Sequence, residues 1–315
     1  MSLSQRSNVF PGPKPMTEPW PKGIRCACLL TFDFDADVVW AYQGVKDPVS
    51  VSMGKFGPKV GVPSLLNLLD MFDIKTTFFV PAWVIENYPA AVEQIVERGH
   101  EIGHHGYLHE PGSSFKSLDE EEEKIVRAME VVTKFCGRRP IGYRAPYFDL
   151  SLNTLAILAK HEFQYTSELM DTLVPEYHII NGRKSGMLNL PIHWVLDDLA
   201  HMYYHITARK SILTCGQILE HYTEQFEAIH AYGGLFTLVM HPEESGRPSR
   251  VLMLKTLIER IKSRSDVWLT SPAEVVKYWQ LAHPVLCENS AAPKTTRVRS
   301  ARIARRCASP QPPRS

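Results

Sequence analysis

The chain has 315 residues, 44% of them hydrophobic, so it can bury a substantial core in one large α/β domain or two smaller ones. No apolar run approaches the roughly 18 residues that a membrane-spanning helix needs, so we expect no membrane association. The net charge of +1 conceals a basic end, because residues 294–315 carry seven Lys and Arg side chains and no acid. The rest of the chain is therefore net acidic, and we expect it not to bind nucleic acid.

The two ends of the chain differ in composition from the part between them. Residues 1–22 are rich in proline and lack the hydrophobic segment of a secretory signal, which predicts an extended arm. Residues 285–315 are expected to form a basic, disordered tail, which leaves residues 23–284 as a single domain. The six cysteines show no framework spacing. Their scatter favours reduced thiols in a cytoplasmic protein.

In chain order, apolar runs alternate with amphipathic segments. An unbroken apolar run over 24–31 predicts a strand buried on both faces, as in a parallel sheet. A glycine-bearing segment over 36–61 follows, which we predict to be a loop, and then a helix over 63–72. Further strands are expected over 75–80, 101–104, 141–144, 163–167, 187–194, 235–240 and 267–270. Further helices are expected over 89–98, 118–135, 151–160, 217–232, 250–261 and from 272 onward.

About eight strands, most of them followed by a helix, predict a (β/α) barrel; an open doubly wound sheet is the alternative. The position of the reactive side chains favours the barrel. They lie at or just beyond the C-terminal ends of different strands, where such barrels carry their active sites. These side chains are Asp33, Asp35, His105, His109, Arg144, Tyr147, Trp194 and His241.

Four histidines within residues 100–109 permit two different metal sites. His100 and His104 fit the H-E-x-x-H pattern of zinc proteases, whose ligands share one face of a helix. Gly99, Gly103 and Gly106 disfavour a helix here, so a short strand is the better interpretation. His105 and His109, just past that strand, are then the preferred ligand pair. The remaining alternative is that all four are loop histidines without a ligand.

Asp35 would complete a set of two histidines and one carboxylate with His105 and His109. This set suits one divalent ion, zinc first, with cobalt, nickel or iron as alternatives. Asp33 lies two residues earlier on the same side of the strand, free to take a proton from attacking water. His241 could donate a proton to a leaving nitrogen. The alternatives are aspartates that cap loops and a histidine with a structural role.

Four further residues complete the predicted site. Arg144 could form an ion pair with Asp33, either to support the base or as a purely structural contact. The aromatic side chains of Trp40, Trp194 and Tyr147 are candidate pocket walls. Ordinary packing is the alternative for all three.

Four motifs together resemble those of the polysaccharide deacetylase superfamily, in order and spacing, over about residues 20–282. They are Thr31–Asp35, His105–His109, Arg144–Tyr147 and Met240–Pro242. The resemblance implies a distorted (β/α) barrel and a role for each matching residue. Those roles are base for Asp33, metal ligands for Asp35, His105 and His109, tuning of the base for Arg144, a backbone N–H toward the oxyanion for Tyr147, and acid for His241.

Two features depart from the usual motifs of the superfamily. In both, the chain resembles the intracellular, atypical peptidoglycan deacetylase-like branch and its allantoinase relatives. Phe34 separates the two aspartates that are usually adjacent, and no Ser or Thr follows His105. The branch implies a homo-oligomeric hydrolase of non-peptide amide bonds in small molecules. The substrate would be an acetylated amino sugar or another amide, or alternatively a cyclic imide or an allantoin-like ureide. A catalytically silent barrel that serves as a binding module is the alternative from another class.

Overall fold

The computed structural model describes residues 19–205 and 211–285, and their sheet is organised around β1 (Cys26–Asp33), the strand expected from the first apolar run. Every residue of β1 is buried, as its unbroken apolar sequence predicts. One edge of β1 pairs in parallel with β8 (Leu235–Met240). The other edge pairs with β9 (Val267–Thr270) over its first half and with β2 (Thr77–Val80) at its end.

The sheet continues from β2 through parallel strands and ends in a hairpin. The strands in order are β3 (Glu101–His104), β4 (Gly142–Tyr143), β5 (Tyr165–Thr166), β7 (Arg183–Asn189) and the antiparallel β6 (Glu176–Ile180). Among the described residues, only one isolated bridge, between Asp197 and Val239, spans the gap between β8 and the β7 side. The sheet is therefore a curled, incomplete barrel, which confirms the predicted fold over the doubly wound alternative.

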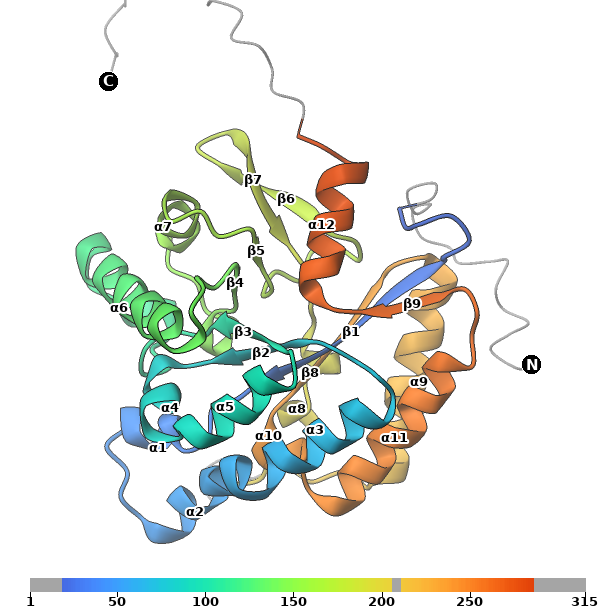
Figure 1. Ribbon diagram of the computed structural model, residues 1–315, viewed down its shortest axis with the longest axis horizontal. Coiled ribbons are helices and arrows are strands. Elements are labelled where there is room, and N and C mark those ends of the chain that lie inside the picture. Colours follow the sequence, from blue (N-terminus) through green and yellow to red (C-terminus); the bar gives the residue numbers. More distant parts are fainter. Residues whose placement is uncertain (1–18, 206–210, 286–315) are drawn as a thin grey trace, which may run out of the picture. The chain divides into compact units, whose positions relative to one another are not determined.

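Helices cover the outside of this sheet, and Figure 1 shows α3 (Val62–Met71), α11 (Pro248–Lys262) and α9 (Cys215–Tyr232) side by side below and to the right of β1. The largest apolar cluster joins β1, β2 and β8 to α3, α5 (Pro89–Glu97), α9 and α11. A second cluster joins β4 to α6 (Leu118–Cys136) and α7 (Thr154–Lys160). The remaining helices are α1 (Val38–Tyr42), α2 (Pro48–Phe56), α4 (Ala82–Asn87), α8 (Leu199–Met202), α10 (Pro242–Ser245) and α12 (Pro272–Ala282).

The inside of the curled sheet has its own core. Ala27 and Leu29 of β1 point into it, and Val275 and Trp279 of α12 cover it near the start of the strand. The Trp20 ring packs against Trp279, with the two ring centroids 5.5 Å apart. This end of the barrel is therefore filled with apolar side chains, while polar groups collect at the opposite end.

The loop predicted over 36–61 is wrong, because the segment folds as α1, α2 and a π-helical turn, Gly57–Gly61. Its glycines allow close packing of backbone on backbone rather than loop flexibility. A Cβ at Gly61 would lie 2.1 Å from the Pro242 carbonyl oxygen, and one at Gly54 would lie 2.3 Å from that of Ala36. The segment is thereby fixed against the end of β8.

Most other predicted boundaries hold within a few residues, but the hairpin was missed. The strand expected over 187–194 lies earlier, as β7, and its partner β6 was not predicted. The expected start of α6 is confirmed, since the Ser117 hydroxyl accepts a hydrogen bond from the Glu120 N–H. No helix of the described residues is long and apolar enough to cross a membrane. Cys26, Cys28, Cys136 and Cys215 are free thiols.

The predicted domain boundaries depend on parts of the chain beyond the structure. Residues 1–18 of the proposed arm and residues 286–315 of the basic tail lie outside the described residues, as do Cys287 and Cys307. The arm, domain and tail boundaries therefore stay predictions.

Candidate metal centre and its cavity

The end of β1 brings two carboxylates into one buried site. Asp33 is the last residue of β1, and Asp35 follows two positions later on the same side, since side chains alternate along an extended strand. Phe34, between them, points the other way into the apolar core and is fully buried. Its N–H donates to the Phe79 carbonyl at 2.8 Å, which prolongs the pairing of β1 with β2. Both carboxylates are buried, at 2% and 4% exposure.

The end of β3 brings two imidazoles to the same place. His105 is the first residue after β3, and its Nε2 lies 3.6 Å from the Asp35 Oδ1. His109 follows in the left-handed backbone region, with φ of 59°, and its Nε2 lies 3.3 Å from the Asp35 Oδ2. One ligand atom from each residue fits within 4.8 Å of the others. The structure thus brings the three predicted ligands together.

The chemistry of this group fits a divalent cation. The Asp35 Oδ1 is buried and has no hydrogen-bond partner in the described part of the chain, a vacancy that a cation would fill. The His105 Nδ1–H donates to the Arg144 carbonyl at 2.7 Å, and this tautomer leaves the Nε2 lone pair facing Asp35. Burial lowers the pKa of His105, which favours the neutral ring that binds metals. Burial opposes the charge of Asp35, but His109 and His105 outweigh it and hold its pKa below the ordinary value.

Asp33 is held by a buried arginine. The Arg144 Nη1 donates to the Asp33 Oδ1 at 2.6 Å, while the Asp33 Oδ2 lies 3.9 Å from the His105 Nε2. Arg144 is fully buried, and its other N–H groups donate to Thr31 and to both oxygens of Ser167. A buried guanidinium with every group satisfied has one fixed position. Arg144 therefore fixes one oxygen of Asp33 and leaves the other facing the histidines.

His241 reaches the same site from the end of β8. It follows β8, its Nε2 lies 3.9 Å from the Asp35 Oδ2, and its Nδ1–H donates to the Asp198 Oδ1 at 2.7 Å. The second Asp198 oxygen accepts from the His241 N–H at 2.8 Å and from the Ser245 hydroxyl at 2.5 Å. Burial by itself lowers the pKa of His241, but the neighbouring Asp198 raises it well above the ordinary value. Asp198 thus favours the protonated form of His241, whose Nε2 faces the site.

Sequence reasoning missed three acidic residues near this ring. Asp198 orients His241, and burial raises the pKa of its neighbour Asp197 to about 7. The adjacent pair of aspartates after an apolar segment was the available signal. Glu243 lines the same cavity, and its Oε2 is buried without a partner among the described residues. Burial raises the pKa of Glu243, so this carboxyl group favours its neutral form.

These residues form the floor of a cavity of about 280 Å³ with aromatic walls. Trp40 of α1 and Trp194, the two predicted pocket walls, both line this cavity; Trp40 is buried and Trp194 is 45% exposed. Tyr147 also lines it, with its ring centroid 4.5 Å from that of His109. Tyr147 and Phe148 both have positive φ angles, 56° and 54°, which is a strained conformation for aromatic residues. Burial raises the pKa of Tyr147 to about 12, so its hydroxyl stays protonated.

The H-E-x-x-H interpretation is wrong. His100 precedes β3 and His104 ends it, so their backbone positions are roughly 13 Å apart along an extended strand rather than on one helix turn. The His100 Nδ1 accepts from the Thr76 N–H at 3.3 Å, and the His104 Nε2 lies 3.1 Å from the Ile125 carbonyl. Burial lowers the pKa of each to about 4. Both are neutral packing residues outside the cavity.

Comparison with known proteins agrees with this geometry. The family model described as polysaccharide deacetylase matches residues 53–166. A peptidoglycan deacetylase of Helicobacter pylori is 30% identical over 270 residues, which cover 76% of this chain and 91% of that protein. The chain belongs to the polysaccharide deacetylase family. It is therefore a hydrolase of carbon–nitrogen bonds other than peptide bonds, in a family whose deacetylases depend on a metal.

Solved structures of the family have the same fold. A Mycobacterium smegmatis protein assigned to the polysaccharide deacetylases is 33% identical, with a TM-score of 0.78 over 86% of this chain and 94% of that one. An allantoinase is 22% identical, with a TM-score of 0.76 over 88% of this chain and 99% of that one, and shows the fold alone. The predicted superfamily and barrel are confirmed. The predicted homo-oligomer and cytoplasmic location stay predictions.

Proposed function

We propose that the chain is a metal-dependent deacetylase that hydrolyses the amide bond of a small N-acetylated substrate. The observation that carries this proposal is the convergence of Asp35, His105 and His109 beside the Asp33 carboxylate on one side and the His241 imidazole on the other. The three ligands leave room for water and for a carbonyl oxygen, as hydrolytic metal sites require. Zinc suits two imidazoles and one carboxylate best, and cobalt, nickel and iron remain candidates.

The remaining residues divide the proton transfers between them. A bound divalent ion would polarise the substrate carbonyl and make water more acidic. Asp33 would accept the proton from the attacking water through the Oδ2 that Arg144 leaves unbound. The Tyr147 backbone N–H would donate to the oxyanion that forms. His241 would then give its Nε2 proton to the leaving nitrogen, as the C–N bond breaks, while Asp198 holds the ring.

The shape of the cavity supports a small substrate. Trp40 and Met53, from α1 and α2, line the cavity that holds the candidate ligands. Backbone contacts at Gly54 and Gly61 fix this segment in place beside the cavity, which favours a small substrate over a polymer strand. An acetylated amino sugar is our leading substrate. The Glu243 carboxyl group in the cavity lining, whose pKa is raised by burial, also favours a cyclic imide or ureide as the second candidate.

A hydrolysis screen tests the proposal. Protein loaded with zinc, and separately with cobalt, nickel or iron(II), would be incubated with acetylated amino sugars, cyclic imides and allantoin. Release of acetate from an amino sugar, lost on chelation and restored by metal, is the expected result. Ring opening of an imide or ureide alone would favour the second candidate. Absence of turnover, with no bound metal and no stability change on chelation, would instead support a silent binding barrel.

A further inference from the structure

A second cavity lies in the gap of the incomplete barrel. The edge of β8 that faces away from β1 is held at two points only among the described residues. The Leu235 N–H donates to the Leu173 carbonyl at 2.7 Å, and the Asp198 N–H donates to the Val239 carbonyl at 3.1 Å. These contacts are four residues apart, or about 13 Å along a strand. The gap between them is not closed by a strand, and a cavity of about 370 Å³ occupies it.

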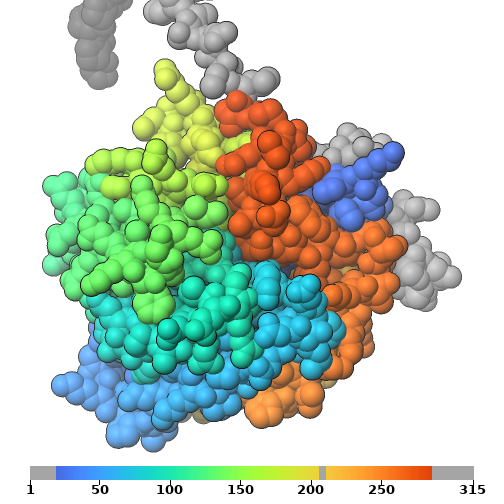
Figure 2. Space-filling view, viewed as in Figure 1, coloured from blue at the N-terminus to red at the C-terminus, as the bar shows by residue number. Residues whose placement is uncertain are grey.

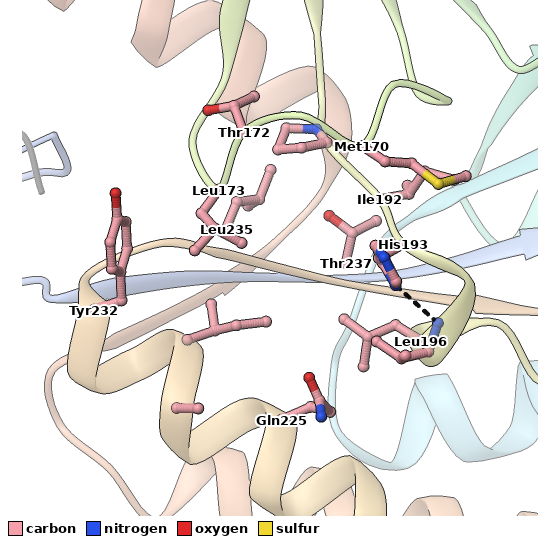
Figure 3. A pocket seen from close by; sticks show the side chains of 14 residues that line it. Met170, Thr172, Leu173, Ile192, His193, Leu196, Gln225, Tyr232, Leu235 and Thr237 are labelled. Carbon is pink, nitrogen blue, oxygen red and sulfur yellow. Dashed lines mark hydrogen bonds between the residues drawn. The ribbon is translucent and has the colours of Figure 1, made fainter. Parts of the chain in front are cut away.

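We call this second cavity the seam cavity. Its lining differs from that of the candidate metal centre because it is mostly apolar. Leu196, Ile192 and Leu235 form a buried apolar floor, while Leu173 and His193 are exposed at the rim (Figure 3). Of the described residues that line it, none is Asp, Glu, Lys or Arg. A charged ligand would therefore lose its hydration without gaining a partner. The seam cavity suits an uncharged molecule.

One polar group in the seam cavity is left unsatisfied. The hydroxyl of Thr237 is buried, at 1% exposure of the residue, and has no hydrogen-bond partner within the described chain. Figure 3 shows Thr237 in the middle of the lining, between Leu235 and His193. The His193 Nδ1, in contrast, already accepts a hydrogen bond from the Val195 N–H, drawn as the dashed line. A buried hydroxyl without a partner costs free energy that a ligand could recover.

We propose that the seam cavity binds an uncharged, largely apolar small molecule that carries one hydrogen-bonding group, which pairs with the Thr237 hydroxyl. A volume of about 370 Å³ lies at the lower end of the roughly 300–1,000 Å³ of small-molecule sites, so the cavity has room for a molecule the size of two fused aromatic rings. The site is separate from the candidate metal centre, because residues 193–197 form a wall between the two cavities. It does not depend on the proposed deacetylase activity.

Binding of a matched pair of probes tests the hydrogen bond. 2-Naphthol carries the required hydroxyl, and naphthalene has the same rings without it. We expect the full chain to bind 2-naphthol about fivefold more tightly, the value of one net hydrogen bond, measured by equilibrium dialysis. The isosteric Thr237→Val variant should bind the two probes equally and should melt at a higher temperature, because the unsatisfied hydroxyl is gone. Equal binding of both probes by the unmodified chain would overturn the assignment of Thr237.

A blocking variant and its control test the location. Ala228 of α9 is exposed at the rim, so Ala228→Trp should cover the cavity without disturbing the core. Glu220→Trp places the same side chain at an exposed site on the same helix, about two turns before Ala228 and outside the cavity lining. We expect naphthol binding to be lost only in Ala228→Trp and to survive in Asp35→Asn. Loss in Asp35→Asn, with normal binding by Ala228→Trp, would place the probe at the metal centre and refute the proposal.

Discussion

The two histidine pairs of residues 100–109 have the same spacing, but only one pair meets a carboxylate. His100 precedes β3 and His104 is its last residue, and both form hydrogen bonds with the backbone. His105 and His109 lie one residue further along, beyond the C-terminal end of the strand, where their rings meet Asp35. A shift of one position moves a side chain to the other face of a strand. The comparison shows that position relative to the strand end, rather than histidine spacing, decides which pair can bind a metal.

Removal of one histidine from each pair should give the largest contrast. We expect His105→Ala to lose the bound ion and more than about 10³-fold in activity, because the ion supplies several kcal/mol of transition-state stabilisation. His100→Ala should retain its metal. Elemental analysis of both purified variants, with the parent chain as the reference, is the measurement. Metal loss in His100→Ala alone would reverse the comparison.

Asp33→Asn tests the carboxylate that faces His105 but is not one of the three ligands. We expect the ion to stay bound, while kcat falls by about 10²–10⁴-fold, the usual contribution of a general base. The asparagine can still accept from Arg144, so the fold should be kept. Hydrolysis assays alongside metal analysis separate the two effects. A parent-like rate would rule out Asp33 as the base.

Asp198→Asn tests whether the Asp198 carboxylate is needed to orient His241 and keep it protonated. The variant keeps the shape of the residue but removes the charge that holds a proton on His241. We expect kcat to fall by about 10–100-fold with unchanged metal content, as for other partners one step from the reacting atoms. Ser245→Ala, which removes one weaker contact to the same carboxylate, is the matched control. An equal loss in both variants would argue that the effect is structural.

The smallest effect concerns the pH dependence of stability. Burial lowers the pKa of His100 to about 4, below the ordinary value near 6.5 of the unfolded chain. Between these values the unfolded chain binds the extra proton, so stability is full above about pH 6.5 and falls as the pH drops toward 4. Melting temperatures of the parent and His100→Gln should therefore converge, or cross, as the pH is lowered through this range. Parallel curves would show that His100 does not contribute.

The ends of the strands could be predicted from the sequence. Because the candidate site is built from the residues at these ends, its position could be predicted as well. Unbroken apolar runs locate β1 and β8, and the polar residues that follow them meet at one end of a parallel barrel. The long-range partners were not predictable in this way. Asp198 reaches His241 only because residues 194–198 cross beside β8, and no local pattern encodes that bridge. The helices of residues 38–61 were missed because glycines that serve close packing look like loop glycines.

Those glycines have a consequence for any redesign of the substrate range. A Cβ at Gly61 or Gly246 would clash with the Pro242 carbonyl, so the backbone of residues 57–61 is held against the turn that follows His241. A change that moved this segment to enlarge the cavity would displace His241 as well. Variation at the side chains of Trp40, Met53 and Trp194, with the glycine scaffold left intact, is the route by which a relative could accept a bulkier substrate and keep its catalytic alignment.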